Sequence, residues 1–140
     1  MLGSADKYTI NVKKIKNLIR QLHLTSEDIK IIPSVPYNEL GYYIKIADCV
    51  VIPSVSEGFG YAALEGIAMA KPVVVSDAGS LPEVVSGKYQ IFKNKDYTEL
   101  AEKVINIAHR KYQHRKKRYF GWEDSVNSYL KAYQSLLPPH

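Results

Sequence analysis

One stretch decides the fold: residues 49–77 read CVVIPSVSEGFGYAALEGIAMAKPVVVSD. Two apolar runs without alternation, Cys49–Ile52 and Val73–Val75, are typical of parallel strands that helices cover on both faces. Between them, a turn flanked by glycines opens a predicted helix over residues 61–70. The stretch therefore predicts a strand–helix–strand unit of an α/β protein.

Helix-like and strand-like patterns alternate along the rest of the chain, which favours the same fold class. We expect further helices that include residues 15–22, 40–47, 100–107 and 126–133, and weaker strands over Ile29–Pro33 and Tyr89–Phe92. Ser80–Glu83 and Asp96–Glu99 are typical of capping boxes and predict two helix starts. Gly41 lies inside a predicted helix at a cost of about 1 kcal/mol relative to alanine, so we expect a tertiary contact that offsets this cost.

Length and charge bound the organisation of the chain. A chain of 140 residues with 46% hydrophobic residues can bury one core, so we expect a single domain over residues 1–140. The formal net charge is +5, but residues 110–118 hold six cations and no acid, and the remainder has 5 − 6 = −1. This distribution disfavours a nucleic-acid-binding surface spread over the fold, and no nucleic-acid partner is expected.

Cysteine content and hydropathy bound the compartment. The one cysteine, Cys49, excludes an intrachain disulfide and a multi-thiolate metal site, and we interpret it as a small hydrophobe in a strand. No apolar stretch has the length of a signal peptide core or of a membrane span. We therefore expect a soluble, cytoplasmic protein.

The loop after Ile52 carries the candidate chemistry, because ligands of parallel sheets bind at the carboxyl ends of the strands. Gly58 and Gly60 let a ligand approach the backbone, and the first N–H groups of the following helix suit a phosphate. Such a turn is common and often binds nothing. Two acids, Glu57 in the loop and Glu65 inside the helix, make the prediction sharper.

A carboxylate only accepts hydrogen bonds, and its two oxygens match a vicinal diol. A nucleotide-sugar offers two polyhydroxy rings with a diphosphate between them. We therefore predict one glutamate on the sugar, one on the ribose, and backbone N–H groups at the diphosphate. Glycoside hydrolysis is the alternative use of paired carboxylates, but it needs them on opposite sides of one bond, whereas one loop and its own helix approach from one side.

Several motifs occur together in this order, and they resemble the donor-binding half of retaining glycosyltransferases of the GT-B architecture, often called group 1 glycosyltransferases. The motifs are Pro53-Ser54, Glu57-Gly58-Phe59-Gly60, Glu65, Lys71-Pro72-Val73-Val74, Ser76-Asp77-Ala78-Gly79 and Leu81-Pro82-Glu83. The resemblance implies a Rossmann-like parallel sheet with helices on both faces. It also implies transfer of a hexosyl group from a nucleotide-sugar to an acceptor, with retention of configuration and without a metal ion or other cofactor.

The resemblance assigns roles to individual residues. Glu57 meets the donor sugar and is the catalytic candidate, while Gly58, Phe59 and Gly60 lie near the sugar and the diphosphate. Glu65 holds the ribose. The loop of Ser34, Val35 and Pro36 matches the place where the nucleobase lies, and no residue is assigned to a metal.

Departures from the family pattern limit what the chain is expected to do. The Arg and Lys that clamp the diphosphate, and the acceptor-binding N-terminal domain, have no counterpart in these 140 residues. We therefore expect an N-terminally incomplete C-terminal domain of a GT-B glycosyltransferase, inactive by itself. The alternative is a catalytically inactive nucleotide-binding or protein-interaction module that retains the fold.

Two surfaces suggest further partners. The basic segment 110–120 leads into the last helix, and we interpret it as a solvated helix end and linker. Its functional alternative is contact with an anionic membrane surface through residues 110–118, which would place the protein at the inner face of the membrane. The last helix has an apolar face, for which we expect core packing, with self-association as the alternative. This face comprises Phe120, Trp122, Val126, Tyr129 and Tyr133.

Overall fold

The computed structural model describes residues 4–32 and 34–136, and the side chains of residues 11–32 and 34–136. The chain divides into two compact units, residues 1–36 and residues 37–140. Each unit is described by itself. The prediction of one domain over residues 1–140 stays a prediction.

The first unit consists of helix α1 (Ser4–Gln21) and the segment that follows it. The predicted helix is confirmed, but its apolar face stays open within the unit, with Ile15, Leu18 and Leu22 exposed. The strand predicted at Ile29–Pro33 is wrong for residues 29–32, which form no strand, and Pro33 lies outside the described residues. A strand requires a hydrogen-bonded neighbour, and the described part of this unit offers only a helix.

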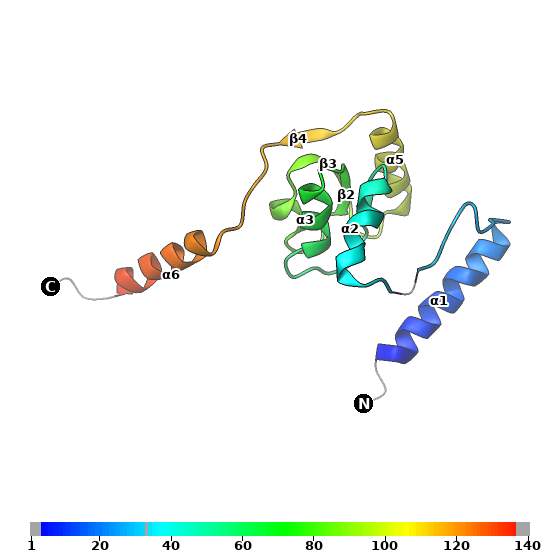
Figure 1. Ribbon diagram of the computed structural model, residues 1–140, viewed down its shortest axis with the longest axis horizontal. Helices are drawn as coiled ribbons and strands as arrows, with labels where there is room; N and C mark the ends of the chain where they lie inside the picture. The colour runs from blue at the N-terminus through cyan, green and yellow to red at the C-terminus, as the bar shows by residue number, and fades with distance from the viewer. Residues whose placement is uncertain (1–3, 33, 137–140) are drawn as a thin grey trace. The chain divides into compact units, whose positions relative to one another are not determined.

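The second unit is built on a four-stranded sheet of order β1-β2-β3-β4. Figure 1 labels its strands β2, β3 and β4. Strands β1 (Val50–Ile52), β2 (Val73–Ser76) and β3 (Gly87–Phe92) are parallel, with Val50 opposite Val73 and Val73 opposite Tyr89. Strand β4 (Gln113–Arg115) pairs antiparallel with β3. The predicted α/β class with a Rossmann-like sheet is confirmed.

Helices cover both faces of β2, which explains its unbroken apolar sequence. Val73 and Val75 pack into a core cluster with Ala63 and Ile67 of α3 (Tyr61–Ala68) and with Leu81 of α4 (Leu81–Val84). Val74 points the other way and packs with Ile107 of α5 (Tyr97–Ala108) and Phe92. Alternate residues of one strand thus feed two cores.

The two predicted capping boxes differ in outcome. Asp96 caps α5, because its carboxylate accepts a hydrogen bond from the Glu99 N–H at 2.8 Å. The Glu99 carboxylate instead accepts from the Lys93 N–H at 2.7 Å, so the reciprocal bond of a full box is absent. The capping box at Ser80 is wrong: Ser80 has helical backbone angles, its hydroxyl caps nothing, and this buried oxygen has no partner in the described part of the chain.

The prediction for the basic segment 110–120 also needs correction. It is not only solvated linker, because residues 113–115 form β4 on the edge of β3. Arg115 donates to the carbonyl oxygens of Pro82 and Val85 at 3.1 and 3.3 Å, and Arg118 donates to that of Glu83 at 2.7 Å. These carbonyls lie in and just after α4, where a cation is favourable. Two of the six cations therefore fasten β4 and the chain after it to the domain.

Helix α6 (Trp122–Leu136) forms as predicted, but none of its residues is buried. The expectation of core packing for the apolar face is wrong for four of its five residues, because Trp122, Val126, Tyr129 and Tyr133 are exposed. The Phe120 ring, just before α6, packs against Phe59. Within residues 4–32 and 34–136, no helix is both long and apolar enough to cross a membrane.

Ala70, two residues after the end of α3, has a left-handed backbone with φ 58°. Its backbone N–H donates to the Ile67 carbonyl oxygen at 3.0 Å. A side chain is strained in this conformation and glycine is not. We expect Ala70→Gly to raise the free energy of unfolding by about 1 kcal/mol. Urea denaturation followed by circular dichroism measures it.

Ala101→Gly is the matched control, because Ala101 is exposed in the interior of α5. This change should lower the free energy of unfolding by about 1 kcal/mol. A loss of stability in Ala70→Gly similar to that in the control would contradict the strain at Ala70.

Candidate functional site

Three loops meet at the carboxyl ends of the parallel strands, where hydrogen bonds join them. The buried Ser76 hydroxyl at the end of β2 donates to the Ser54 carbonyl after β1 at 2.6 Å. Asn94, after β3, donates its side-chain N–H to the Val55 carbonyl at 2.9 Å and its backbone N–H to the Asp77 carboxylate at 2.7 Å. The loop after β1, which contains Glu57, is thus held by its two neighbours.

The Glu57 carboxylate closes this loop onto the start of α3. One oxygen accepts the Gly60 N–H at 3.2 Å, and the other accepts the Ser54 hydroxyl at 3.3 Å. Glu57 is partly buried and forms no ion pair within the described residues. Each carboxylate oxygen can accept a second hydrogen bond, so the side chain keeps capacity for a ligand hydroxyl.

Backbone contact between loops fixes the position of Glu57. A Cβ at Gly79, whose φ is +54°, would overlap the Glu57 carbonyl oxygen. Gly60 has φ +93°, and a Cβ there would lie 2.9 Å from Leu81 Cδ2. Gly58 is different, because a Cβ there would meet no atom within 4 Å. Glycine is therefore required at positions 79 and 60 by geometry.

The start of α3 supplies backbone donors beside Glu57. In the described part of the chain, the N–H groups of Tyr61 and Ala62 have no hydrogen-bond partner, as expected for the first turn of a helix. The Phe59 ring packs against Tyr61 and Phe120, with ring centroids 5.0 and 5.3 Å apart. The loop thus presents free N–H groups and one carboxylate, while its aromatic side chain packs within the protein.

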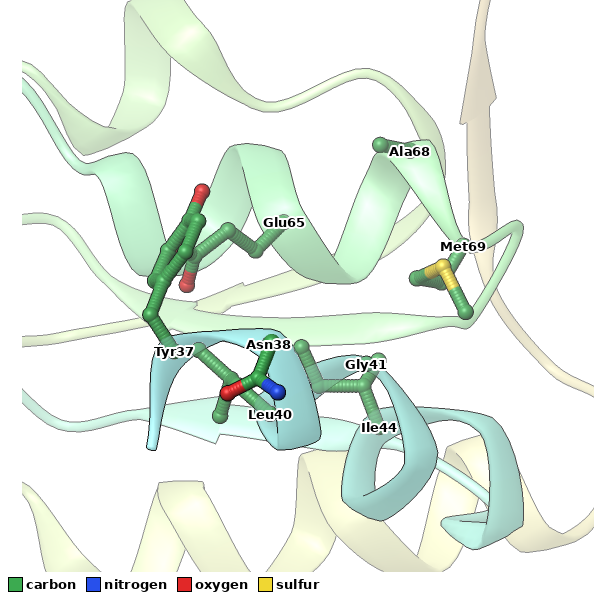
Figure 2. A pocket seen from close by; sticks show the side chains of 8 residues that line it. All are labelled: Tyr37, Asn38, Leu40, Gly41, Ile44, Glu65, Ala68 and Met69. Atoms are coloured by element: carbon green, nitrogen blue, oxygen red, sulfur yellow. The ribbon is translucent and has the colours of Figure 1, made fainter. Parts of the chain in front are cut away.

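Glu65 lines a pocket of about 280 Å³ between α2 (Tyr37–Ile46) and α3. The Glu65 carboxylate stands beside the Tyr37 ring, with Asn38, Leu40 and Gly41 along the α2 wall (Figure 2). Ile44 of α2, Ala68 of α3 and Met69 complete the lining. No group of the described residues donates a hydrogen bond to the Glu65 carboxylate or pairs with it. A partly buried carboxylate therefore faces open space.

Gly41 contributes to this space. The expected tertiary contact is wrong, because a Cβ at position 41 would meet no atom within 4 Å. Gly41 lines the pocket instead. A glycine inside a helix thus leaves room next to Glu65 at the expense of helix propensity.

The eight residues predicted to bind the donor lie in two parts of the chain. Ser34, Val35 and Pro36 end the first unit, and they form neither helix nor strand. Glu57, Gly58, Phe59, Gly60 and Glu65 all lie in the second unit, on the loop after β1 and on α3. The ligand-binding roles predicted for these eight residues stay predictions.

Asp77 and Cys49 both have contacts that a structural role explains. The Asp77 carboxylate does not cap α4, and it accepts a hydrogen bond from the Asn94 backbone N–H. Burial, followed by the Asp48 carboxylate, raises the pKa of the Cys49 thiol, so the thiol stays protonated at neutral pH. Cys49 packs against the core of Val74, Phe92 and Ile107, as a small hydrophobe would.

The sequence interpretation missed the residues that hold the site. Ser76 and Asn94 could have been found from their places at the carboxyl ends of β2 and β3, where polar side chains gather. Tyr37, Asn38 and Leu40 had no such signal beyond their closeness to Gly41, an unfavourable residue inside a helix.

Comparison with known proteins assigns the chain to a family. Residues 10–120 match the family model described as glycosyl transferases group 1. This match covers most of the chain, and the protein belongs to the group 1 glycosyltransferases. The resemblance seen in the sequence is confirmed, and the fold is that of a GT-B C-terminal domain.

Curated relatives support the same family. An uncharacterized glycosyltransferase of Methanocaldococcus jannaschii is 28% identical over 134 residues, covering 89% of this chain and 38% of that protein. A D-inositol 3-phosphate glycosyltransferase of Corynebacterium jeikeium is 30% identical over 139 residues, covering 87% of this chain and 33% of that protein. The chain thus spans about a third of the length of these relatives.

The close approach of Gly79 to Glu57 gives a prediction for the loop. We expect Gly79→Ala to lower the free energy of unfolding by at least about 2 kcal/mol, because the methyl group must displace backbone and the residue has a positive φ. Gly58→Ala, in the loop after β1, should change the free energy of unfolding by no more than about 0.5 kcal/mol. Urea denaturation of the two variants compares them, and equal stabilities would contradict the contact.

Proposed function

We propose that this chain is the donor-binding half of a retaining glycosyltransferase that transfers a hexosyl group from a nucleotide-sugar to an acceptor. Family membership supports glycosyl transfer. The proposal adds that the donor is a nucleotide-sugar. The observation that carries it is Glu65, a carboxylate that faces a pocket of about 280 Å³ without a hydrogen-bond donor among the described residues. Because such a carboxylate needs donors, a ribose diol is a fitting ligand.

The loop before α3 supports the other parts of the donor. The N–H groups of Tyr61 and Ala62 lie at a helix start, which favours a diphosphate. Glu57 is next to them and keeps acceptor capacity for a sugar hydroxyl. The exposed Gly58, where a Cβ would meet no atom within 4 Å, leaves the backbone accessible, whereas Gly60 is buried and donates its N–H to Glu57. In this proposal, the N–H groups stabilise the charge that develops on the departing diphosphate, and no metal ion takes part.

The chain by itself is proposed to bind the donor weakly and to catalyse no transfer, because it spans about a third of its relatives. An acceptor site and the diphosphate-clamping cations would come from the rest of such a protein.

One observation favours the second candidate, an inactive module that retains the fold. Both oxygens of Glu57 already accept hydrogen bonds from its own loop, which is a sufficient structural role for this residue.

Two substitutions test the pocket by different means. Glu65→Gln removes the negative charge of the carboxylate that accepts hydrogen bonds from the diol, so the affinity for a nucleotide-sugar should fall about ten-fold or more. Gly41→Leu fills the space beside Glu65, so binding should fall although helix propensity rises by about 1 kcal/mol. Isothermal titration of the chain with a panel of UDP-, GDP- and ADP-sugars, together with urea denaturation, separates binding from stability.

Glu102→Gln is the matched control, since Glu102 is exposed on α5 and lines no part of the pocket. Its affinity should equal that of the unmodified chain. If Gly41→Leu binds every donor as tightly as the unmodified chain, the pocket does not hold the nucleotide. If Glu57→Gln lowers stability alone, the inactive module becomes the better proposal.

We also propose that the apolar face of α6 drives self-association, because its exposed aromatic residues form an apolar surface. The weight-average mass in sedimentation equilibrium should rise with concentration above the 15.8 kDa of one chain. Tyr129→Lys should suppress this rise, whereas Asn127→Lys adds the same charge at a polar position of the same helix and should not. A constant mass of 15.8 kDa at all concentrations would refute it.

A cytoplasmic location, with residues 110–118 touching an anionic membrane at its inner face, is the accompanying proposal. It is supported by four cationic residues of the segment whose side chains donate to no carbonyl oxygen among the described residues, namely Arg110, Lys111, Lys116 and Lys117. Cations near an anionic surface contribute about 1 kcal/mol each.

A further inference from the structure

The chain between β4 and α6 returns to the loop that carries Glu57. The Phe120 ring meets the Phe59 ring edge to face, with centroids 5.3 Å apart and an interplanar angle of 79°. Phe59 also packs against the ring of Tyr61, the first residue of α3, at 5.0 Å. Phe59 belongs to neither hydrophobic core cluster of the domain. Its ring is therefore held by aromatic contacts, one of which comes from the C-terminal segment.

Arg118 explains why Phe120 reaches this place. Its guanidinium donates to the Glu83 carbonyl oxygen at 2.7 Å, and its backbone N–H donates to the buried Ser86 hydroxyl at 3.4 Å. The guanidinium carbon lies 5.5 Å from the centroid of the Phe120 ring, a distance at which a cation and an aromatic ring attract each other. The segment 118–120 is thus fastened to α4 and to the residues just after it.

The same helix, α4, also backs the loop after β1. The Ser80 N–H, just before α4, donates to the Glu57 carbonyl oxygen at 3.5 Å. Leu81 of α4 lies against Gly60, where a Cβ would come within 2.9 Å of Leu81 Cδ2. The loop and the segment 118–120 therefore share one support, and the contact of Phe120 with Phe59 joins them directly.

Phe59 is the side chain through which this loop can be anchored. It stands between Gly58 and Gly60, and glycines permit many backbone conformations. The turn around it is closed by the hydrogen bond from the Gly60 N–H to Glu57 Oε1 at 3.2 Å. A displaced Phe59 would therefore open the turn and release the Glu57 carboxylate from its orientation.

We propose that Phe120 is a positioning residue for this loop: its ring holds Phe59 and thereby the turn that orients Glu57. The C-terminal segment then completes the donor site without touching the donor. The effect on donor binding rests on the proposed function, whereas the effect on the loop does not. An edge-to-face ring pair contributes enough free energy to change a local equilibrium about three- to ten-fold.

Hydrogen exchange measured by NMR tests the loop without a donor. In Phe120→Ala, the Gly60 N–H should exchange about three- to ten-fold faster, whereas the N–H groups of the buried β2 should keep their rates. Phe120→Tyr retains the ring and should restore slow exchange. Tyr119→Ala is the matched control, because Tyr119 is exposed and its ring contacts no other ring among the described residues. The reference chain and all variants carry Tyr129→Lys, so that a change in self-association through α6 cannot cause the difference.

Isothermal titration with the panel of UDP-, GDP- and ADP-sugars gives the second readout. Phe120→Ala should lower the affinity for the bound donor about three- to ten-fold, and Tyr119→Ala should not. Unchanged exchange at Gly60, equal acceleration of all N–H groups, exchange in Phe120→Tyr as fast as in Phe120→Ala, or unchanged affinity for a bound donor would each overturn the proposal. If the reference chain binds no donor, the proposed donor site fails, and the exchange rate of Gly60 alone decides whether Phe120 holds the loop.

Discussion

The contact between the backbone of Gly79 and that of Glu57 is the constraint on which the candidate site depends. The loops after β1 and β2 approach so closely there that no side chain fits at position 79. Ser76 and Asn94 add hydrogen bonds from the same neighbouring segments to residues 54 and 55. The loop is thus held by the segments that follow β2 and β3, and the hydrogen bonds of the Glu57 carboxylate to Ser54 and Gly60 hold its orientation.

The two glutamates have different surroundings, although the sequence presents them as a pair. Glu57 accepts two hydrogen bonds within its loop, whereas Glu65 accepts none from the described residues and faces the α2–α3 pocket. A preorganised acceptor loses little freedom when a ligand arrives, but it offers fewer free lone pairs. In the proposed donor complex, Glu57 would therefore accept from a single hydroxyl in a fixed position, and Glu65 would accept from a diol that brings its own donors.

Patterns of one element at a time were sufficient to predict much of this architecture. The unbroken apolar runs at 50–52 and 73–75, and the helical spacing of apolar residues in α5 and α6, are local patterns that can be read from the sequence. β4 could not be predicted in this way, because Gln113-His114-Arg115 has no apolar alternation and owes its conformation to the edge of β3 and to Arg115. The reverse holds for Ile29–Ile32, in which three isoleucines surround Lys30. These residues form no strand, because the described part of their unit offers no strand as a partner. The identity of the site residues followed from motifs, but the close contact at Gly79 joins separate loops and leaves no local signal.

The sheet separates two chemistries along its strands. At the carboxyl ends, the polar groups are acceptors and helix N–H donors, held by Ser76 and Asn94. At the amino ends lie Lys71 and Lys88, and the Lys88 nitrogen is 5.1 Å from the centroid of the Tyr112 ring. Parallel strands make this separation natural, because every loop that follows a strand lies at one end and every loop that precedes one lies at the other. The antiparallel strand β4 adds one cation, Arg115, and adds it at the amino end, since its register with β3 covers Gly87, Lys88 and Tyr89. A short edge strand thereby adds a basic side chain to the domain without altering the end at which Glu57 lies.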